Sequence, residues 1–247
     1  MYIIGLILIA TGLFGFNVSE NIVAIVIICI GGISLYITQN YILSFIAILA
    51  INGGFYALIT MNHHYHLIHM YINVNVILLE FVMLNEARLI SSHKIISKLY
   101  NPLRIGLIIS LLAGFIMMSV PLYTVDWISS IASISIIFYV AYKILKINNI
   151  NDSKNKILVF ALCAFVLIPT VLYPPIPGAI LIILLSFLVN YKTGFVIAII
   201  TLIYFVSRFY YDLTFTLLTK SIILFSSGIL FMLLYLLISK KSTNEKV

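Results

Sequence analysis

The stretch ILSFIAILAINGGFYALITM, residues 42–61, runs for 20 residues without a charged side chain. A helix of about 20 apolar residues is long enough to cross the hydrocarbon core of a bilayer. Similar apolar runs follow one another from residue 2 to residue 239, with only short polar breaks between them. The stretch and its repetition therefore predict an all-α, polytopic transmembrane helical bundle.

The composition excludes a water-soluble fold. Hydrophobic residues make up 63% of the 247 residues and charged residues 9%, whereas soluble domains contain about 45–50% apolar residues. The formal net charge of +7 would indicate an anionic partner in a soluble protein, but in a membrane chain basic residues act first as topology signals. We therefore expect a lipid bilayer around the chain and no nucleic-acid partner.

Ten apolar runs predict about ten membrane spans in one integral-membrane domain, 1–247. Four runs lie in residues 1–84 and six in residues 105–239, with a polar connection at 85–104 and a polar tail at 240–247. Some runs are shorter than about 20 residues, so they borrow flanking polar residues, thin the bilayer or form half-helices. The ten runs are 2–16, 22–37, 42–61, 67–84, 105–123, 128–147, 157–173, 177–189, 194–210 and 217–239.

The basic residues predict the orientation of these spans, because Lys and Arg gather on the cytoplasmic side of a membrane. If the C-terminal tail KKSTNEKV is cytoplasmic, ten crossings place twelve of the fourteen basic residues on the cytoplasmic side. Both termini are then cytoplasmic as well. The two exceptions are Arg208 and Lys220, on the predicted external side.

The connection NEARLISSHKIISKLYNPLR, residues 85–104, mixes apolar and basic side chains. It is predicted to be an amphipathic cytoplasmic segment. An ordinary loop whose charges set the topology is favoured over a helix that lies on the inner leaflet with its lysines toward anionic headgroups. Both interpretations stay open.

Two Gly-Gly pairs lie in neighbouring spans, Gly31 with Gly32 and Gly53 with Gly54. Small residues let membrane helices approach closely. All four glycines are therefore predicted to mark a tight contact between helices.

The segment IPTVLYPPIPGAI, residues 168–180, is interrupted by prolines and a glycine. Proline removes a backbone donor and disfavours helix in the residue before it. We predict a kink at Pro169 and a sharp external turn around residues 174–178. The alternative is a broken helix of the kind that forms transporter binding sites.

The cluster NHHYHLIH, residues 62–69, leads from the predicted external side into a span that contains Glu80. On a helix, His66, His69, Asn73 and Glu80 share one face. Histidines at this spacing can bind a transition metal, and an intramembrane carboxylate is a candidate for proton or cation handling. A polar turn is favoured over a metal site, so no metal or cofactor is expected, and Glu80 remains a candidate functional residue.

The stretch SRFYYDLTFTLLTKSIILFSSG, residues 207–228, carries the charges that break the orientation bias. Arg208 and Asp212 are four residues apart and are predicted to form an ion pair at the external boundary, while Thr216 and Lys220 extend the face of Asp212. Such charges either snorkel and cap at helix ends or face a bundle interior or a partner. The two interpretations are weighed equally, and all four residues are candidate functional residues.

The C-terminal sequence combines a Pro/Gly-Ala entry, the signature Y-Y-x-L-x-x-T-L-L-x-K-S and a later S-G. In these features the chain resembles an uncharacterised bacterial integral-membrane family, domain of unknown function 4401. The resemblance implies an inner-membrane location, no established activity, and a frequent gene neighbour encoding a membrane-anchored GDYXXLXY-type protein with an extracytoplasmic domain. The matching residues are Pro177, Gly178, Ala179, Tyr210, Tyr211, Leu213, Thr216, Leu217, Leu218, Lys220, Ser221, Ser227 and Gly228.

No catalytic motif accompanies these features. The sequence has no G-x-S-x-G elbow, no H-E-x-x-H pair and no phosphate-binding glycine loop, so an enzyme is not expected. The favoured hypothesis is a non-enzymatic component of a membrane complex with an extracytoplasmic partner. The alternative is a small-solute or ion transporter with Glu80 and the break at 169–178 beside its path.

Overall fold

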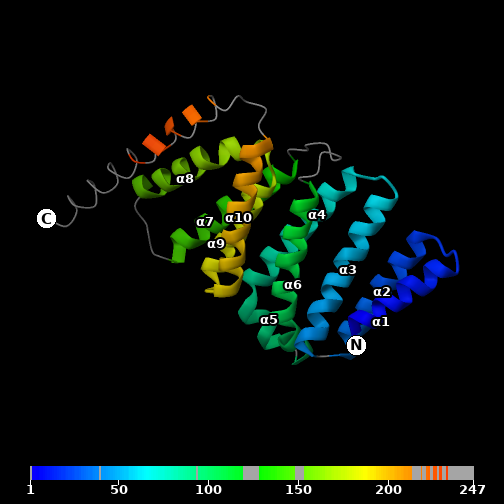
Figure 1. Cartoon of the computed structure of the whole chain (residues 1–247). Coiled ribbons are helices and arrows are strands. Elements are labelled where there is room, and N and C mark those ends of the chain that lie inside the picture. Colours follow the sequence, from blue (N-terminus) through cyan, green and yellow to red (C-terminus); the bar gives the residue numbers. More distant parts are fainter. Residues whose placement is uncertain are drawn as a thin grey trace. The chain divides into compact units, whose positions relative to one another are not determined.

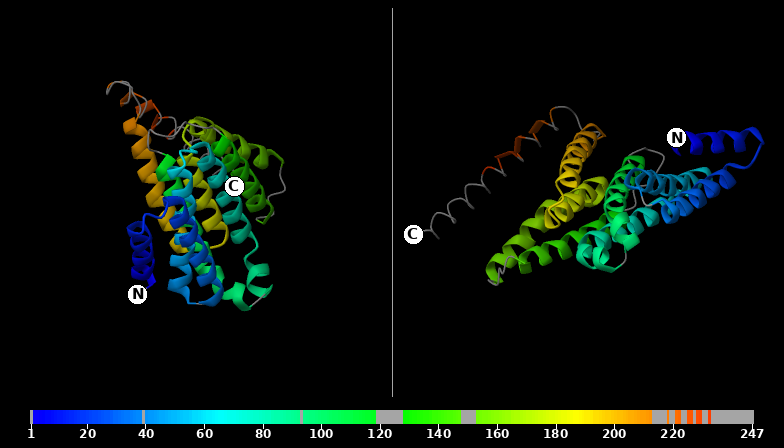
Figure 2. Two further views of the ribbon diagram at one scale, coloured as in Figure 1. Left: turned by 90° about the vertical axis from the view of Figure 1, so that its right-hand side faces the viewer. Right: turned by 90° about the horizontal axis from the view of Figure 1, so that it is seen from below.

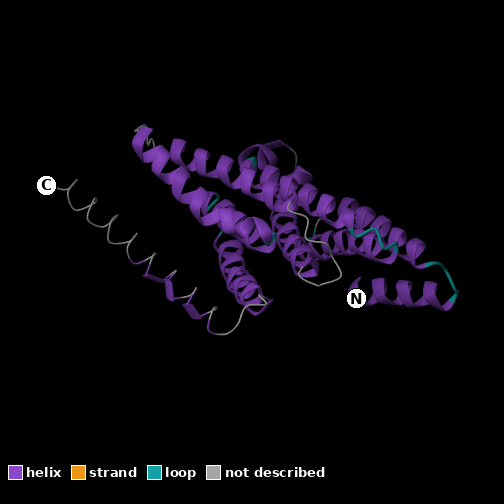
Figure 3. Cartoon of the chain, turned by 90° about the horizontal axis from the view of Figure 1, so that it is seen from above, coloured by secondary structure: helices purple, strands orange, loops and turns teal. Residues whose placement is uncertain are grey.

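The structure, a computed structural model of the chain, describes residues 2–38, 40–92, 94–118, 128–147 and 153–212, and single positions at 218, 221, 222, 225, 226, 228, 229 and 232. The chain divides into two compact units, Met1–Ile203 and Tyr204–Val247. The regular structure of the described residues is entirely helical, without a strand (Figure 3). The predicted all-α class is confirmed.

Nine of the ten predicted apolar runs coincide with a described helix (Figure 1). The tenth run, 217–239, lies outside the described residues except for single positions. The helices are α1 Tyr2–Gly15, α2 Glu20–Ile37, α3 Tyr41–Met61, α4 His66–Leu84, α5 Glu86–Ser92, α6 Lys94–Met118, α7 Ile128–Ile147, α8 Ser153–Leu167, the 3-10 helix η1 Ile168–Leu172, α9 Pro175–Leu188 and α10 Lys192–Asp212.

Six of the described helices are long and apolar enough to cross a membrane: α2, α3, α4, α6, α7 and α10. The apolar helices α1, α8 and α9 are shorter. With 14 residues, α9 extends only about 21 Å at 1.5 Å per residue, less than the roughly 30 Å of a bilayer core. The total of ten spans and the cytoplasmic location of both termini stay predictions.

The centre of the first unit is formed by α4, α6, α7 and α9. α4 packs against the other three, and α9 also packs against α6 and α7. The side chains that face one another between these helices are fully buried. Those with no exposed surface include Ile72, Leu111, Val140 and Ile182. Nine of the fourteen residues of α9 are buried, so this short helix is a core element of the unit.

At one edge of the unit, α1 packs on α2, and α3 packs between α2 and α6 (Figure 2). The predicted glycine contact lies between α2 and α3, but only one glycine of each pair takes part. A Cβ atom on Gly31 would lie 2.8 Å from Cγ1 of Ile51, and one on Gly54 would lie 2.6 Å from Cγ1 of Ile28. At Gly32 and Gly53, a Cβ atom would have no described atom within 4 Å, apart from those of the adjacent residues and of the helix backbone around it. The prediction is therefore confirmed for Gly31 and Gly54 and wrong for their neighbours, which lie on the outer sides of the helices.

Among the described turns between consecutive helices, three use a residue other than glycine in the left-handed region of the backbone. Asn17, His63 and Asn190 have φ values of 54°, 55° and 55°. At the end of α9, the N–H of Tyr191 donates to the carbonyl of Ser186 (2.7 Å) and that of Asn190 donates to Phe187 (3.1 Å). This pair of bonds is the Schellman arrangement, which satisfies carbonyls that the helix end leaves free. The turn to α10 is therefore short and well defined.

Two predicted connections are helical where the sequence favoured irregular structure. Residues 85–104 contain α5 and the start of α6, which begins at Lys94, ahead of the apolar run at 105. This is closer to the helical alternative than to the favoured loop. Of the prolines after residue 173, only Pro174 precedes α9, which begins at Pro175, because proline fits a first helical turn that needs no N–H partner. At Pro169 the helix changes to the 3-10 form, as expected for a kink.

Candidate functional site

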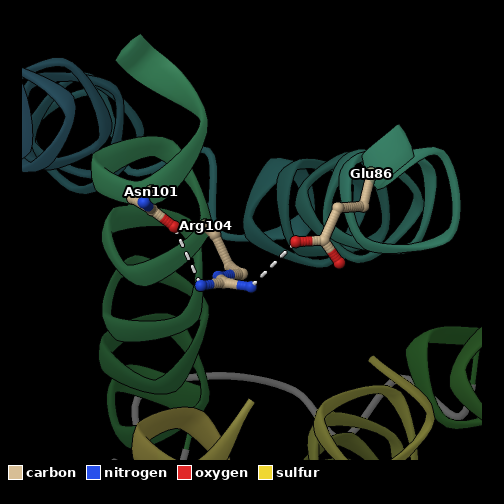
Figure 4. A network of polar contacts seen from close by, with 3 residues as sticks. All are labelled: Glu86, Asn101 and Arg104. Carbon is tan, nitrogen blue, oxygen red and sulfur yellow. Dashed lines mark hydrogen bonds and ion pairs between the residues drawn. The ribbon is translucent and has the colours of Figure 1, made fainter. Parts of the chain in front are cut away.

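Arg104, in the first half of α6, is the centre of a polar cluster at one end of the first unit. Its side chain is only 12% exposed and forms an ion pair with Glu86 of α5, with 3.6 Å between Nη1 and Oε1. Nη2 donates a hydrogen bond of 2.9 Å to Oδ1 of Asn101 (Figure 4). An enclosed charge needs a compensating charge and hydrogen-bond partners. Glu86 provides the charge and Asn101 a hydrogen bond, while Nε has no partner among the described residues; the ion pair joins α5 to α6.

The turn between α9 and α10 completes this cluster. The guanidinium carbon of Arg104 lies 3.6 Å from the ring centroid of Tyr191 and 5.1 Å from that of Tyr100. The planar guanidinium stacks well on an aromatic face. Burial raises the pKa of the Tyr191 hydroxyl, and the positive charge of Arg104 opposes this rise. We call Glu86, Tyr100, Asn101, Arg104 and Tyr191 the Arg104 cluster; it joins α5, α6 and the α9–α10 turn.

Glu80 lies near the end of α4 and lines a pocket of about 290 Å³ together with Lys143 of α7. Tyr139 and Asn85 line the same pocket, and the charge of Lys143 acts on the Glu80 carboxyl. A neighbouring pocket of about 490 Å³ is lined by Glu86 and again by Lys143. The candidate carboxylate therefore faces a basic side chain from another helix.

These features share one end of the first unit, where α4, α7 and α9 end and where α5, α6 and α10 begin. The pocket beside Glu86 is also lined by Ile147 of α7 and by Leu188 and Val189 at the end of α9. An alternating membrane path requires these segments to lie on the same side. The charge bias predicts that this end is cytoplasmic.

The predicted ion pair of Arg208 and Asp212 is present in the last turns of α10, with 3.2 Å between Nε and Oδ2. Both side chains are exposed, at 39% and 49%. The rings of Tyr210 and Tyr211 meet edge to face beside the pair. Thr216 and Lys220 lie outside the described residues, so their predicted continuation of this face stays a prediction.

The predicted polar face of α4 does not form a single site. His66 is exposed at the start of the helix, whereas His69 is buried with its Nδ1 3.3 Å from the hydroxyl oxygen of Ser129 in α7. Glu80 lies at the other end of the helix with Lys143. Within the described residues, no group of three or more His, Cys, Asp or Glu side chains is arranged to hold a metal ion.

Three residues of these clusters were not predicted as site residues. Arg104 and Lys143 were interpreted only as topology signals, and Tyr191 was not singled out. Arg104 pairs with Glu86 of the preceding helix and with Tyr191 after α9, and Lys143 of α7 lines a pocket with Glu80 of α4. Such pairs have no local spacing rule. One available signal was the position of Arg104 at the border of an apolar run, where a charged side chain turns toward a partner or toward water.

The comparisons with known proteins extend the resemblance seen in the C-terminal sequence. The family described as "Domain of unknown function (DUF4401)" matches residues 1–241, and the chain belongs to this family. No curated protein and no solved structure matches the chain.

Proposed function

We propose that this DUF4401 protein is a non-enzymatic component of a complex in the bacterial inner membrane, bound to a membrane-anchored partner with an extracytoplasmic domain. The apolar helices support the membrane location, and the family resemblance supports the class of partner, a GDYXXLXY-type protein. The proposed contact is the predicted external end of α10, around Arg208 and Asp212.

The observation that carries this proposal is the exposed ion pair itself. An exposed pair at i,i+4 spacing contributes little to stability, because water and salt screen it and two side chains must be ordered. Arg208 also stands on the side where the topology disfavours basic residues. Helix stability therefore does not account for these charges, whereas recognition of charged groups on a partner does.

The proposal is tested by co-expressing the chain with the GDYXXLXY-type protein and measuring how much of that protein copurifies. The double variant Arg208→Gln and Asp212→Asn removes both charges without changing side-chain size greatly, and recovery of the partner should fall. Arg88→Gln, an exposed arginine of α5, is the matched control and should leave recovery unchanged. Equal recovery from all three proteins, at equal membrane abundance, contradicts docking at this pair.

A photo-crosslinking amino acid provides a direct measurement of contact. Tyr211 and Tyr36 are 76% and 78% exposed and lie at opposite predicted sides of the membrane. A benzoylphenylalanine at position 211 should crosslink to the partner, and one at position 36 should not. Crosslinks from position 36 alone would place the contact elsewhere.

Small-solute or ion transport is the second candidate function, because Glu80 and Lys143 face one pocket. Beyond this pocket the core is closed by apolar side chains, since Ile72, Val76 and Leu79 of the same helix have no exposed surface. This closed core favours the first proposal over transport. Proteoliposomes with a pH-sensitive dye test the alternative for protons. Flux above that of protein-free liposomes, abolished by Glu80→Gln, supports proton transport, and flux equal to that of protein-free liposomes ends this candidate for protons.

A further inference from the structure

A pocket of about 440 Å³ opens beside the turn between α9 and α10, separate from the end of α10 proposed for docking. Its wall is formed by Phe187, Phe195 and Val196, and its rim carries Asn190 and Lys192. The volume falls in the range of roughly 300–1,000 Å³ found for ligand sites. An apolar wall with a basic rim fits an amphipathic, anionic ligand.

Ser186 supplies a polar group inside this pocket. The residue is 1% exposed, and its hydroxyl oxygen has no hydrogen-bond partner within the part of the chain that the structure describes. Its backbone carbonyl is already occupied by the N–H of Tyr191. A buried hydroxyl without a partner is costly, so this hydroxyl is available to a ligand that enters the pocket.

The start of α10 adds a second source of positive potential at the rim. The first hydrogen bond into this helix is donated by the N–H of Phe195 to the carbonyl of Tyr191, at 3.0 Å. The N–H groups ahead of Phe195 have no helical acceptors, and the helix dipole favours an anion there. Tyr191, which lines the pocket, is held in place by its stacking on Arg104.

We propose that this pocket binds an anionic phospholipid. The phosphate lies at Lys192 and the first N–H groups of α10, and one acyl chain lies along Phe187, Phe195 and Val196. The hydroxyl of Ser186, about one helical turn or 5 Å further from the rim, donates a hydrogen bond to an ester carbonyl of the lipid. The predicted orientation places Lys192 on the cytoplasmic side, where anionic lipids attract basic residues.

The test compares phosphatidylglycerol with phosphatidylcholine in detergent micelles, with bound lipid measured by native mass spectrometry. The wild-type protein should bind phosphatidylglycerol more tightly. Lys192→Gln should weaken phosphatidylglycerol binding about fivefold, the effect of one lysine near an anionic surface, and leave phosphatidylcholine binding unchanged. Ser186→Ala should weaken the binding of both lipids, because both carry the ester. Lys94→Gln, an exposed lysine outside the pocket, should change neither.

Three results would overturn the proposal. Equal binding of the two lipids by the wild type would show that the pocket does not prefer an anionic lipid. Equal losses of phosphatidylglycerol binding in Lys94→Gln and Lys192→Gln would indicate a diffuse charge effect. Displacement of phosphatidylglycerol by millimolar inorganic phosphate assigns the rim to a free anion instead of a lipid. Thermal unfolding of Ser186→Ala without added lipid checks the fold, and the variant should be at least as stable as wild type, because it removes a buried hydroxyl that has no hydrogen-bond partner among the described residues.

Discussion

The contact between α2 and α3 predicts opposite effects for the same substitution at two adjacent residues. At Gly54, an added Cβ atom would lie 2.6 Å from Cγ1 of Ile28 and 3.2 Å from the carbonyl oxygen of Ala24. At Gly53, it would meet no atom within 4 Å. Gly54→Ala should therefore destabilise the protein, and Gly53→Ala should stabilise it.

Two contributions determine how much each substitution changes the free energy of unfolding. Replacing glycine by alanine inside a helix stabilises it by about 0.8–1 kcal/mol, and this contribution is common to both variants. At Gly54 the Ile28 side chain can move, but the Ala24 carbonyl belongs to the backbone of α2, so α2 and α3 must separate. Overpacking of this kind costs about 1–3 kcal/mol. Because the helix contribution cancels, the two variants should differ by about 1–3 kcal/mol in free energy of unfolding.

Thermal unfolding in detergent measures this difference. For a chain of this size, each kcal/mol shifts Tm by roughly 2–4 °C, so Gly54→Ala should unfold about 2–12 °C below Gly53→Ala. Gly31→Ala and Gly32→Ala repeat the comparison on α2, where a Cβ on Gly31 would lie 3.1 Å from the carbonyl oxygen of Ala47. If the two alanines of a pair shift Tm equally, the close approach of these helices is refuted.

Two further variants test the interior of the first unit. Glu86→Gln should lower the free energy of unfolding by about 1–3 kcal/mol, because it leaves the enclosed Arg104 charge without its counter-charge. Arg88→Gln on the same helix should have little effect. Thermal unfolding measures both variants, and equal shifts in Tm would argue against the Arg104 cluster. Gly178→Ala should be strongly destabilising, since its Cβ would overlap the ring of Phe115. Adding Phe115→Leu should recover part of the lost free energy of unfolding in a double-mutant cycle. Strictly additive changes in this free energy would rule out the contact.

The helices themselves are largely predictable from the sequence because their cause is local. A backbone surrounded by lipid must satisfy its own N–H and C=O groups, and a helix does so within one segment. An apolar run such as residues 42–61 therefore becomes α3, Tyr41–Met61. The ion pair of Arg208 and Asp212 was predictable for the same reason, since residues four apart on one helix are neighbours.

The local sequence pattern did not predict which glycine, Gly53 or Gly54, faces the neighbouring helix. Because α2 and α3 are apolar on every side, hydrophobicity does not mark the face that turns inward. A finer signal was present, since Ala24 and Gly31, like Ala47 and Gly54, are seven residues apart and lie on one side of their helix. This spacing would have selected Gly31 and Gly54 over their neighbours.

By itself, the sequence determined that this protein is helical and where most of its helices lie, and it predicted which charges break the orientation bias. Only the tertiary structure decided that Arg104 meets Glu86 and Tyr191, that Glu80 meets Lys143, and that the short helix α9 is enclosed by its neighbours. The physical reason is the range of the interactions. Backbone hydrogen bonds and i,i+4 pairs act within one helix, whereas contacts between helices depend on how each helix is rotated and which neighbour it meets, and both are settled by side-chain packing across the whole bundle.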